Sequence, residues 1–434
     1  MKVGFVSLGC SKNLIDTEMA IGVFKNNNFE IVNSVDEAEI IVVNTCGFIE
    51  SAKEEAINTI LEMSEYKKTG KCKYLIAMGC LVERYYDELK KALPEIDLLI
   101  PIKKYNDFWK EIEKLVEPQI KNNCNMEYLE RVITTGKTTA YLKIAEGCSN
   151  RCTYCAIPYI RGPYVSRPMQ DILKEAKKLA NEGYKELILI AQDTTKYGID
   201  LYEKLSLAEL LENLCEIKEF KWIRFLYAYP ETITDELIDV VKNNDQICNY
   251  FDIPIQHISD SVLKKMNRQS TEKEIRSIIR KIKDNIPDVI LRTSLIVGFP
   301  EESEDDFKKL CSFVGEGNFN KLGVFTYSKE DGTPASRMKN QIHHNTKKRR
   351  YNTIMKIAQE ISNKNMKKNI GKTFDVLIEN KTFDGKFYIG RTYMDIPDTD
   401  GVVIIKNIKE NLEGNFVKCK ILDVSDYDLI AEQI

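Results

Sequence analysis

Gly147-Cys148-Ser149-Asn150-Arg151-Cys152-Thr153-Tyr154-Cys155 follows an apolar strand and carries three cysteines in CxxxCxxC spacing. Thiolates favour iron–sulfur clusters or zinc over hard metals. Three of them can bind three irons of a 4Fe-4S cluster, which leaves the fourth iron open to a substrate. A structural zinc site needs a fourth ligand nearby, but none follows and the nearest histidine is His257. The alternative is three free or buried thiols, yet the spacing favours a catalytic cluster.

The sequence after this loop alternates strands and helices. We expect strands at 140–145, 187–191, 222–227, 250–253, 290–297 and 321–326, and helices at 170–182, 207–217, 235–242, 271–285 and 304–315. Six βα repeats predict a barrel or a partial barrel, whose catalytic groups lie at the carboxyl ends of the strands. The CxxxCxxC loop follows the first of these strands and fits that rule.

The N-terminal segment shows the same alternation. Strands are expected at 3–8, 40–43 and 74–78, and helices at 13–24, 50–63 and 82–93, which predicts a parallel sheet covered by helices. Cys10, Cys46 and Cys80 each come directly after one strand and next to a glycine. Ligands bind outside the carboxyl ends of such strands, and glycine lets the backbone approach closely. We therefore expect a second iron–sulfur cluster here; the alternative is three ordinary half-buried thiols.

Composition limits the class of protein. The 434 residues are 43% hydrophobic and 30% charged, and no run reaches about 18 uncharged apolar residues, so a globular protein without a membrane span is expected. The N-terminus lacks a signal-peptide layout. That favours the cytoplasm, where twelve cysteines indicate metal ligation over disulfides. A net charge of −3 does not suggest a nucleic-acid binder. No pattern marks the other cysteines, Cys72, Cys124, Cys215, Cys248, Cys311 and Cys419.

Two further segments and a linker complete the chain. The linker is polar and is predicted at residues 118–135. Residues 343–368, with the run Lys347-Lys348-Arg349-Arg350, predict a basic helix that docks through an apolar stripe and keeps its charged face in solvent. A nucleic-acid patch is the alternative for this helix. Residues 371–434, with strands at 374–378, 401–405 and 416–424, predict a small antiparallel β-barrel.

The barrel segment is acidic: residues 371–434 have 8 Lys and Arg against 12 Asp and Glu, a net charge of −4. An RNA-binding barrel should be basic, because phosphate contacts dominate affinity, whereas an acidic barrel suits a basic protein partner. The alternative is that its aspartates only form turns. They gather in two loops, Asp395, Asp398 and Asp400 in the first and Asp423, Asp426 and Asp428 in the second.

The whole chain resembles the radical S-adenosylmethionine (SAM) methylthiotransferases. The stretches that carry the resemblance are SLGCSKNL (7–14), NTCGFI (44–49), GCLVERY (79–85), EGCSNRCTYC (146–155), PYIRG (158–162), AQDTT (191–195), IVGFPE (296–301), GRTY (390–393) and DTDG (398–401). SLGCSKN and NTCGF resemble the branch that modifies an aspartate of small-subunit ribosomal protein S-twelve. The MiaB-like branch, which methylthiolates carbon 2 of adenosine in tRNA, is the alternative. Ser11 stands where many relatives have proline.

The resemblance implies three domains: an N-terminal cluster domain at 1–117, a radical SAM core at 134–365 and a TRAM barrel at 367–434. It also implies two 4Fe-4S clusters, with Cys148, Cys152 and Cys155 as ligands of the catalytic one. That cluster would bind SAM, and one electron would cleave SAM to a deoxyadenosyl radical. Cys10, Cys46 and Cys80 would hold the auxiliary cluster, whose open iron would bind the sulfide that becomes the methylthio group.

Candidate SAM contacts follow from position. Gln192 and Asp193 end one core strand and Gly298 ends another; Tyr154 lies within the cluster loop, and Arg292 could meet the carboxylate of SAM. The alternatives are a cap or turn role for Asp193, packing on the cluster for Tyr154 and a structural ion pair for Arg292. Expected partners are ribosomal protein S-twelve and an electron donor such as flavodoxin or ferredoxin, with no membrane and no direct nucleic-acid contact. A non-enzymatic iron–sulfur sensor is the competing class of protein.

Overall fold

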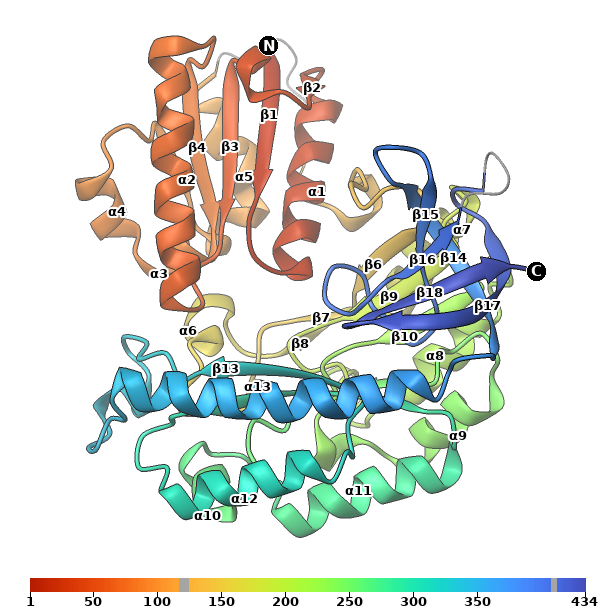
Figure 1. The fold of residues 1–434 in the computed structure, drawn as a ribbon. Coiled ribbons are helices and arrows are strands. Elements are labelled where there is room, and N and C mark those ends of the chain that lie inside the picture. Colours follow the sequence, from red (N-terminus) through yellow and green to blue (C-terminus); the bar gives the residue numbers. More distant parts are fainter. Residues whose placement is uncertain (117–124, 407–411) are drawn as a thin grey trace. The chain divides into compact units, whose positions relative to one another are not determined.

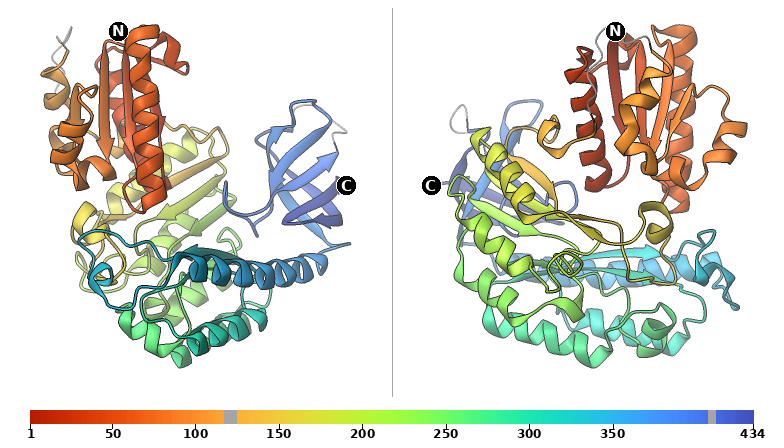
Figure 2. Two further views of the ribbon diagram at one scale, coloured as in Figure 1. Left: turned by 60° about the vertical axis from the view of Figure 1, so that its left-hand side comes forward. Right: turned by 180° about the vertical axis from the view of Figure 1, so that it is seen from behind.

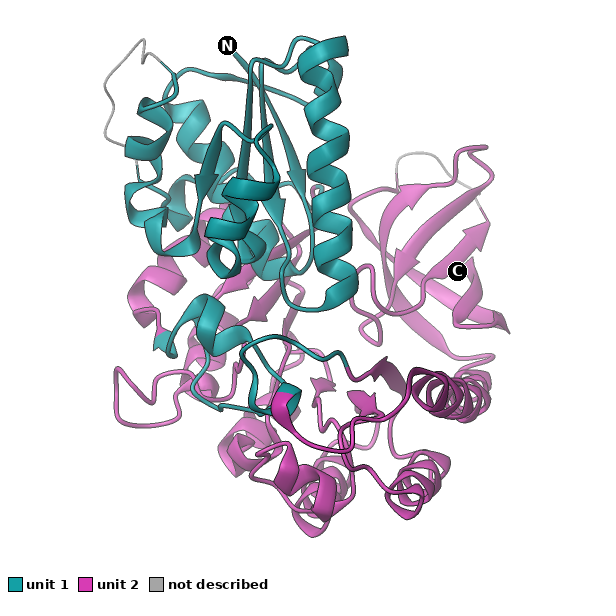
Figure 3. Cartoon of the chain, turned by 90° about the vertical axis from the view of Figure 1, so that its left-hand side faces the viewer, with its two compact units in different colours: residues 1–136, 145–165, 328–336 teal, residues 137–144, 166–327, 337–434 magenta. Residues whose placement is uncertain are grey.

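The computed structural model describes residues 1–116, 125–406 and 412–434, and the chain divides into two compact units (Figure 3). The first unit contains Met1–Gly136, Ala145–Val165 and Ser328–Ser336, and the second contains Lys137–Ile144, Ser166–Tyr327 and Arg337–Ile434. The CxxxCxxC loop therefore belongs to the same unit as the N-terminal segment. The domain ranges 1–117, 134–365 and 367–434 stay a prediction. Residue 117, Cys124 and part of the predicted linker lie outside the described residues.

The first unit is built on a five-stranded parallel sheet in the order β2-β1-β3-β4-β5 (Figure 1). Its strands are fully buried in the middle, because helices cover both faces and leave only apolar positions there. On one face α2 and α4 pack on Ile41 and Leu75, and on the other α1 and α5 pack on Val42 and Ile76. The bounds are β1 Lys2–Ser7, α1 Ser11–Asn26, β2 Glu30–Val32, β3 Ile40–Thr45, α2 Glu50–Thr69, β4 Tyr74–Gly79, α3 Cys80–Arg84, α4 Tyr86–Ala92, β5 Leu98–Ile100, α5 Phe108–Glu113 and α6 Ile157–Arg161.

The three predicted strands and the parallel sheet of this unit are confirmed. Two edge strands were not predicted, because β2 and β5 have only three residues each and show no clear periodicity. The helix predicted over 82–93 is wrong in one respect: it is broken at Tyr85 into α3 and α4. Tyr85 lies outside the helical region of the backbone, with φ −132° and ψ 39°.

The core of the second unit is an open barrel of six parallel strands. β6, β9 and β10 form one three-stranded sheet and β11, β12 and β13 form another, and a bridge between Ile223 and Ile247 extends the first toward the second. The predicted partial barrel is therefore confirmed. The bounds are β6 Thr139–Lys143, α7 Met169–Asn181, β9 Glu186–Ile190, α8 Leu207–Cys215, β10 Trp222–Phe225, α9 Asp235–Asn243, β11 Tyr250–Asp252, α10 Asp260–Lys265, α11 Glu272–Asn285, β12 Ile290–Val297, α12 Glu304–Gly315, β13 Lys321–Thr326 and α13 His344–Lys367. Two short strands, β7 Ala145–Glu146 and β8 Val165–Ser166, pair beside the cluster loop.

The C-terminal strands close into a barrel in the order β14-β15-β16-β18-β17, which Figure 2 shows in blue. The bounds are β14 Thr373–Lys381, β15 Phe387–Arg391, β16 Val403–Lys406, β17 Phe416–Ser425 and β18 Asp428–Gln433. The predicted small antiparallel barrel is confirmed, with one exception among its pairs: β16 and β18 pair in parallel. Five strands cannot alternate in direction all the way around a closed ring, so one parallel pair is required.

A buried charge network joins this barrel to the core within the second unit. Glu186, the first residue of β9, accepts hydrogen bonds from Arg391 Nη2 of β15 at 2.6 Å and from Arg224 Nε of β10 at 2.7 Å. All three side chains are buried. Burial alone would raise the pKa of Glu186, but the guanidinium groups of Arg391 and Arg224 outweigh it and hold this pKa at about 2. The barrel is therefore fixed to the core by ionised groups.

This depressed pKa predicts loss of stability in acid. At pH values above 4.5, the ordinary pKa of a glutamate, the ionised Glu186 carboxylate stabilises the folded state. This stabilisation is lost as the pH falls from 4.5 through 2. At neutral pH it is worth about 3 kcal/mol of unfolding free energy, of which about 2 kcal/mol is lost between pH 5 and pH 3. Urea unfolding of the cluster-free chain at pH 5 and pH 3 measures this loss of unfolding free energy. The loss should be smaller in Glu186→Gln and unchanged in the exposed control Glu219→Gln.

Within the described residues, no helix is both long and apolar enough to cross a bilayer.

Candidate functional site

The CxxxCxxC loop is held by tight backbone contacts. Cys148 N–H donates to the Gly162 carbonyl at 3.1 Å, and Ala335 N–H donates to the Thr153 carbonyl at 2.9 Å. Cys148 and Cys152 are buried and Cys155 is half-buried. Gly147 has φ +74°, and a Cβ there would lie 2.0 Å from the Pro163 carbonyl oxygen. The local fold therefore requires glycine directly before the first cysteine.

This contact predicts that Gly147→Ala disrupts the loop. An alanine at φ > 0 costs about 1–2 kcal/mol, and the overlap with Pro163 forces the backbone to move as well. Gly162 is a matched control, because its φ is also +74° but nothing lies within 4 Å of its Cβ position. We expect purified Gly147→Ala to lose the iron of one cluster and Gly162→Ala to keep it, as measured by iron and sulfide content. Equal iron in the two variants would contradict this account of the loop.

Cys10, Cys46 and Cys80 meet at the carboxyl ends of neighbouring strands. A Cβ on Gly9, which has φ +87°, would lie 2.8 Å from Cys46 Cβ. Burial raises the pKa of the Cys80 thiol to about 11, and the charges of Cys10 and Cys46 add to that rise while Arg161 opposes it. Convergence of the three thiols on one cluster stays a prediction.

Asn13, which the sequence analysis did not select, ties the three strand ends together. Its Nδ2 donates to the carbonyls of Leu8 at 3.1 Å and Thr45 at 3.0 Å, and its Oδ1 accepts from Cys80 Sγ at 3.3 Å. Its own carbonyl accepts from Asn44 Nδ2 at 2.7 Å. Asn13 is fully buried. The SKN (11–13) and NTC (44–46) stretches therefore share one buried hydrogen-bond network next to the thiols.

The donor chemistry of both sets fits iron–sulfur clusters. Each set offers three thiols, and a 4Fe-4S cluster takes each thiolate on a different iron. Over the residues that the structure describes, no group of three or more Cys, His, Asp or Glu side chains is arranged to hold a single metal ion. The assignment of the six cysteines as ligands stays a prediction.

Three of the predicted SAM contacts lie at carboxyl ends of core strands in the second unit. Gln192 and Asp193 follow β9, and Gly298 follows β12. Asp193 is fully buried, and its Oδ1 accepts from Thr195 Oγ1 at 2.9 Å and from the Lys196 amide at 3.3 Å. These contacts match the turn role that was the alternative for Asp193. Tyr154 is half-buried in the cluster loop of the first unit.

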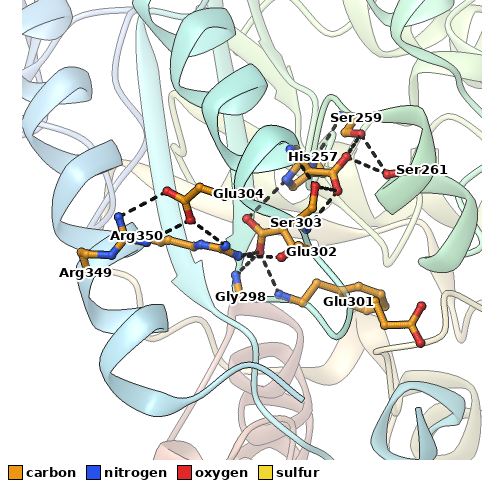
Figure 4. Close-up of polar contacts among 12 residues, drawn as sticks. His257, Ser259, Ser261, Gly298, Glu301, Glu302, Ser303, Glu304, Arg349 and Arg350 are labelled. Carbon is orange, nitrogen blue, oxygen red and sulfur yellow. Dashed lines mark hydrogen bonds and ion pairs between the residues drawn. The ribbon is translucent and has the colours of Figure 1, made fainter. Parts of the chain in front are cut away.

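Gly298 is constrained by the elements behind it. It has φ +73°, and a Cβ there would lie 2.4 Å from Lys347 Cγ of α13. Its amide donates to the buried Glu302 carboxylate, which also accepts from the Phe299 amide at 3.1 Å and pairs with Arg350 at 3.2 Å (Figure 4). The Gly298 amide is therefore hydrogen-bonded within the protein, and its place beside SAM stays a prediction.

The basic run of α13 is partly used inside the fold. Lys347 Nζ donates to the Tyr327 carbonyl at 2.7 Å, and Arg349 and Arg350 both pair with Glu304 (Figure 4). The helix docks as predicted, and Lys348 and Arg349 of its basic run are exposed, as a solvated face requires. Arg350 is the exception, because it is buried and ion-paired.

Arg292 is placed in the ion pair that was its alternative. Its guanidinium lies 2.9 Å from Asp252 and 3.7 Å from Asp400. Arg292 is the third residue of the eight-residue strand β12, toward the amino end and away from the end where catalytic groups gather. We therefore leave Arg292 out of the proposed SAM contacts.

Two of the three aspartates in the first acidic loop of the barrel are used inside the fold. Asp395 is buried and lies 2.6 Å from Lys321 Nζ, and Asp400 accepts from the Tyr250 hydroxyl at 2.7 Å. The third aspartate of the loop, Asp398, is exposed. The charge argument for a basic partner is wrong for Asp395 and Asp400, because their charges are neutralised within the fold. Asp423 and Asp426 of the second loop are exposed.

Comparisons with known proteins agree with this architecture. Residues 2–101 match the model described as "Uncharacterized protein family UPF0004", residues 142–314 the Radical SAM superfamily and residues 370–434 the TRAM domain. "Ribosomal protein uS12 methylthiotransferase RimO" of Alkaliphilus oremlandii is 62% identical over 100% of this chain and 99% of its own length. The protein of the same name from Clostridioides difficile is 51% identical over 100% and 98%.

Solved structures share the fold at low identity. The radical S-adenosylmethionine methyltransferase TsrM of Kitasatospora setae has a TM-score of 0.56 at 11% identity and covers 77% of this chain and 76% of its own. The cobalamin-dependent SAM radical enzyme OxsB has a TM-score of 0.53 at 14% identity over 82% and 56%. Both likenesses concern the fold alone.

A CxxxCxxC loop after the first strand of an open parallel barrel defines a radical SAM enzyme. The chain belongs to the RimO family of radical SAM methylthiotransferases, as its full-length identity to these relatives shows. It is an enzyme of that class that works with 4Fe-4S clusters and SAM. The predicted family, fold class, enzyme class and cofactors are confirmed, and these relatives do not favour the tRNA-modifying alternative.

Proposed function

We propose that this protein methylthiolates the β-carbon of an aspartate in ribosomal protein uS12. The observation that carries the proposal is the presence of two separate sets of three cysteines in one unit, one on the CxxxCxxC loop and one at the ends of β1, β3 and β4. One set suffices to cleave SAM, whereas insertion of sulfur needs a second site that holds it. The names of the full-length relatives support uS12 as the substrate.

The roles of the residues follow from this division. Cys148, Cys152 and Cys155 would hold the cluster that binds SAM, and Cys10, Cys46 and Cys80 would hold the auxiliary cluster. When bound, the two clusters and SAM supply the electron, the carbon radical and the methylthio group. The protein fixes both sets of thiols through the turns at Gly147, Gly9 and Gly79. Tyr154, Gln192, Asp193 and Gly298 remain proposed neighbours of SAM.

A radical is needed because the target is an unactivated C–H bond. The β-hydrogen of an aspartate is not acidic enough for a side-chain base to remove at a useful rate. The residues of this chain therefore position SAM and substrate and exclude water rather than transfer protons. No group of the protein is assigned as general acid or base in this account.

The partners follow from the same proposal. A basic ribosomal protein would meet the exposed carboxylates of Asp398, Asp423 and Asp426 by complementary charge. The electron would come from a small redox protein such as flavodoxin or ferredoxin, in the cytoplasm where ribosomes are assembled. Direct binding of nucleic acid has no role in the proposed reaction.

The proposal is tested with the reconstituted full-length protein, SAM, a reductant and uS12, either free or in the small subunit. We expect deoxyadenosine to form and one uS12 aspartate to gain a methylthio group in place of hydrogen, as measured by peptide mass spectrometry. Deoxyadenosine formation with unmodified uS12 and modified tRNA would favour the tRNA-modifying alternative. Absence of deoxyadenosine from the protein with both clusters would indicate a non-enzymatic iron–sulfur protein.

A further inference from the structure

Arg161 lies beside the thiol of Cys80, and the roles assigned above do not use it. It is the last residue of α6 and is 7% exposed. Its Nη2 lies 3.5 Å from Cys80 Sγ and also donates to Asp16 at 2.8 Å and to Asn13 Oδ1 at 2.5 Å. Its Nη1 donates to Glu146 at 3.0 Å. One guanidinium thus contacts a proposed cluster ligand and two carboxylates.

These contacts join the elements that carry the two sets of cysteines. Arg161 ends α6, which begins two residues after Cys155 of the CxxxCxxC loop. Asn13 and Asp16 belong to α1, which begins directly after Cys10, and Cys80 is the first residue of α3. Cys80 also packs on Ile160 of α6 in a small buried apolar cluster. Displacement of Arg161 would therefore disturb both sets of thiols at once.

The positive charge of Arg161 is buried 3.5 Å from the Cys80 sulfur, where water screens it little. A cluster held by Cys10, Cys46 and Cys80 becomes more negative when it is reduced. Hydrogen bonds to its sulfurs and nearby positive charge stabilise that reduced form and raise the reduction potential.

We propose that Arg161 is a positioning residue for the auxiliary cluster, which it holds against α6 and whose reduction potential it raises through its contact with Cys80 Sγ. The proposal rests on the proposed function, because it takes Cys10, Cys46 and Cys80 as the ligands of that cluster. Arg161 belongs to neither set of cysteines, and we expect it to change the reduction potential of the auxiliary cluster.

The chain offers a matched control in Arg131. Arg131 is also buried and also pairs with a carboxylate of α1, Glu18. Arg131 and Arg161 therefore make the same kind of buried ion pair on the same helix, and Arg161 in addition lies 3.5 Å from the Cys80 sulfur. Loss of either arginine should cost similar stability, so a difference between the two variants reports on the cluster.

The test uses the full chain with Cys148, Cys152 and Cys155 all replaced by alanine, so that only the auxiliary cluster remains. The reduction potential of that cluster is measured by redox titration with electron paramagnetic resonance, in the parent, in Arg161→Met and in Arg131→Met. We expect the potential to fall in Arg161→Met and to stay at the parent value in Arg131→Met. Arg161→Lys, which keeps the charge but not the forked geometry, should fall by less.

Each further outcome has a defined meaning. Loss of the cluster from Arg161→Met with retention in Arg131→Met would support the positioning role. An unchanged potential in Arg161→Met, or equal changes in both variants, would overturn the proposal. If the parent cluster survives Cys80→Ala, Cys80 is not a ligand, and both the ligand assignment and the proposal fail. If the cluster is lost in Cys80→Ala but is unaffected by Arg161→Met, the ligand assignment stands and only the proposal for Arg161 fails.

Discussion

Cys148→Ala and Cys80→Ala should both abolish methylthiolation of uS12, but only Cys148→Ala should abolish cleavage of SAM. Cys148 belongs to the set of thiols assigned to the SAM-binding cluster, and removal of one of three ligands leaves that cluster without a stable site. Cys80 belongs to the other set, so its loss removes the sulfur-holding site and leaves the first cluster in place. Each of these two substitutions should lower the yield of methylthiolated uS12 more than any of the other substitutions does.

The two activities are measured in the same reaction, deoxyadenosine by chromatography and the modified uS12 peptide by mass spectrometry. Cys215→Ala is the control, because Cys215 is a buried thiol at the end of α8 in the second unit and belongs to neither set. It should keep both activities. Methylthiolated uS12 from Cys80→Ala, or deoxyadenosine from Cys148→Ala, would show that the two sets were assigned wrongly.

Arg391→Met should destabilise the chain by about 3–5 kcal/mol, because it removes one partner from a buried ion network. Arg391 is fully buried, and its Nη2 lies 2.6 Å from both Glu186 and Glu379. Methionine fills similar space but leaves the Glu186 carboxylate with only Arg224 to balance it. A loss of this size is a large share of the stability of a typical domain. We expect it to lower the denaturant concentration at which half of the second unit is unfolded.

A double-mutant cycle separates the charge from the packing. Arg391→Met combined with Glu186→Met removes both partners of the closest pair and should recover part of the loss, with a coupling energy of about 1–3 kcal/mol. The exposed Arg280→Met should change stability by less than about 0.5 kcal/mol. If Arg391→Met costs no more than Arg280→Met, the barrel is not fixed to the core by these charges.

Most of the fold could be predicted because its signals are local. Strands β12 and β13 match their predicted ranges fully, since both are rich in β-branched and other apolar residues. The short edge strands β2 and β5 and the parallel pairing of β16 with β18 could not be predicted. The first two have too few residues for a period to emerge, and the last depends on ring closure rather than on any one strand.

The candidate site divides in the same way. The strand-end cysteines could be predicted because the carboxyl ends of parallel strands share one edge of a sheet. Asn13 and Arg161 could not, although both lie in stretches that carry the family resemblance, because their partners are distant in sequence. Asp395 was misinterpreted for a related reason: its ion pair with Lys321 forms only when the barrel meets the core.

The mass of uS12 in cells that lack this protein tests the proposed function as a whole. We expect uS12 from a deletion strain to lack the methylthio group, and wild-type protein but not Cys80→Ala to restore it. The tRNA from the same cells should be unchanged. Unchanged uS12 beside a lost tRNA modification would contradict the proposal and make the chain a tRNA-modifying methylthiotransferase on the same scaffold.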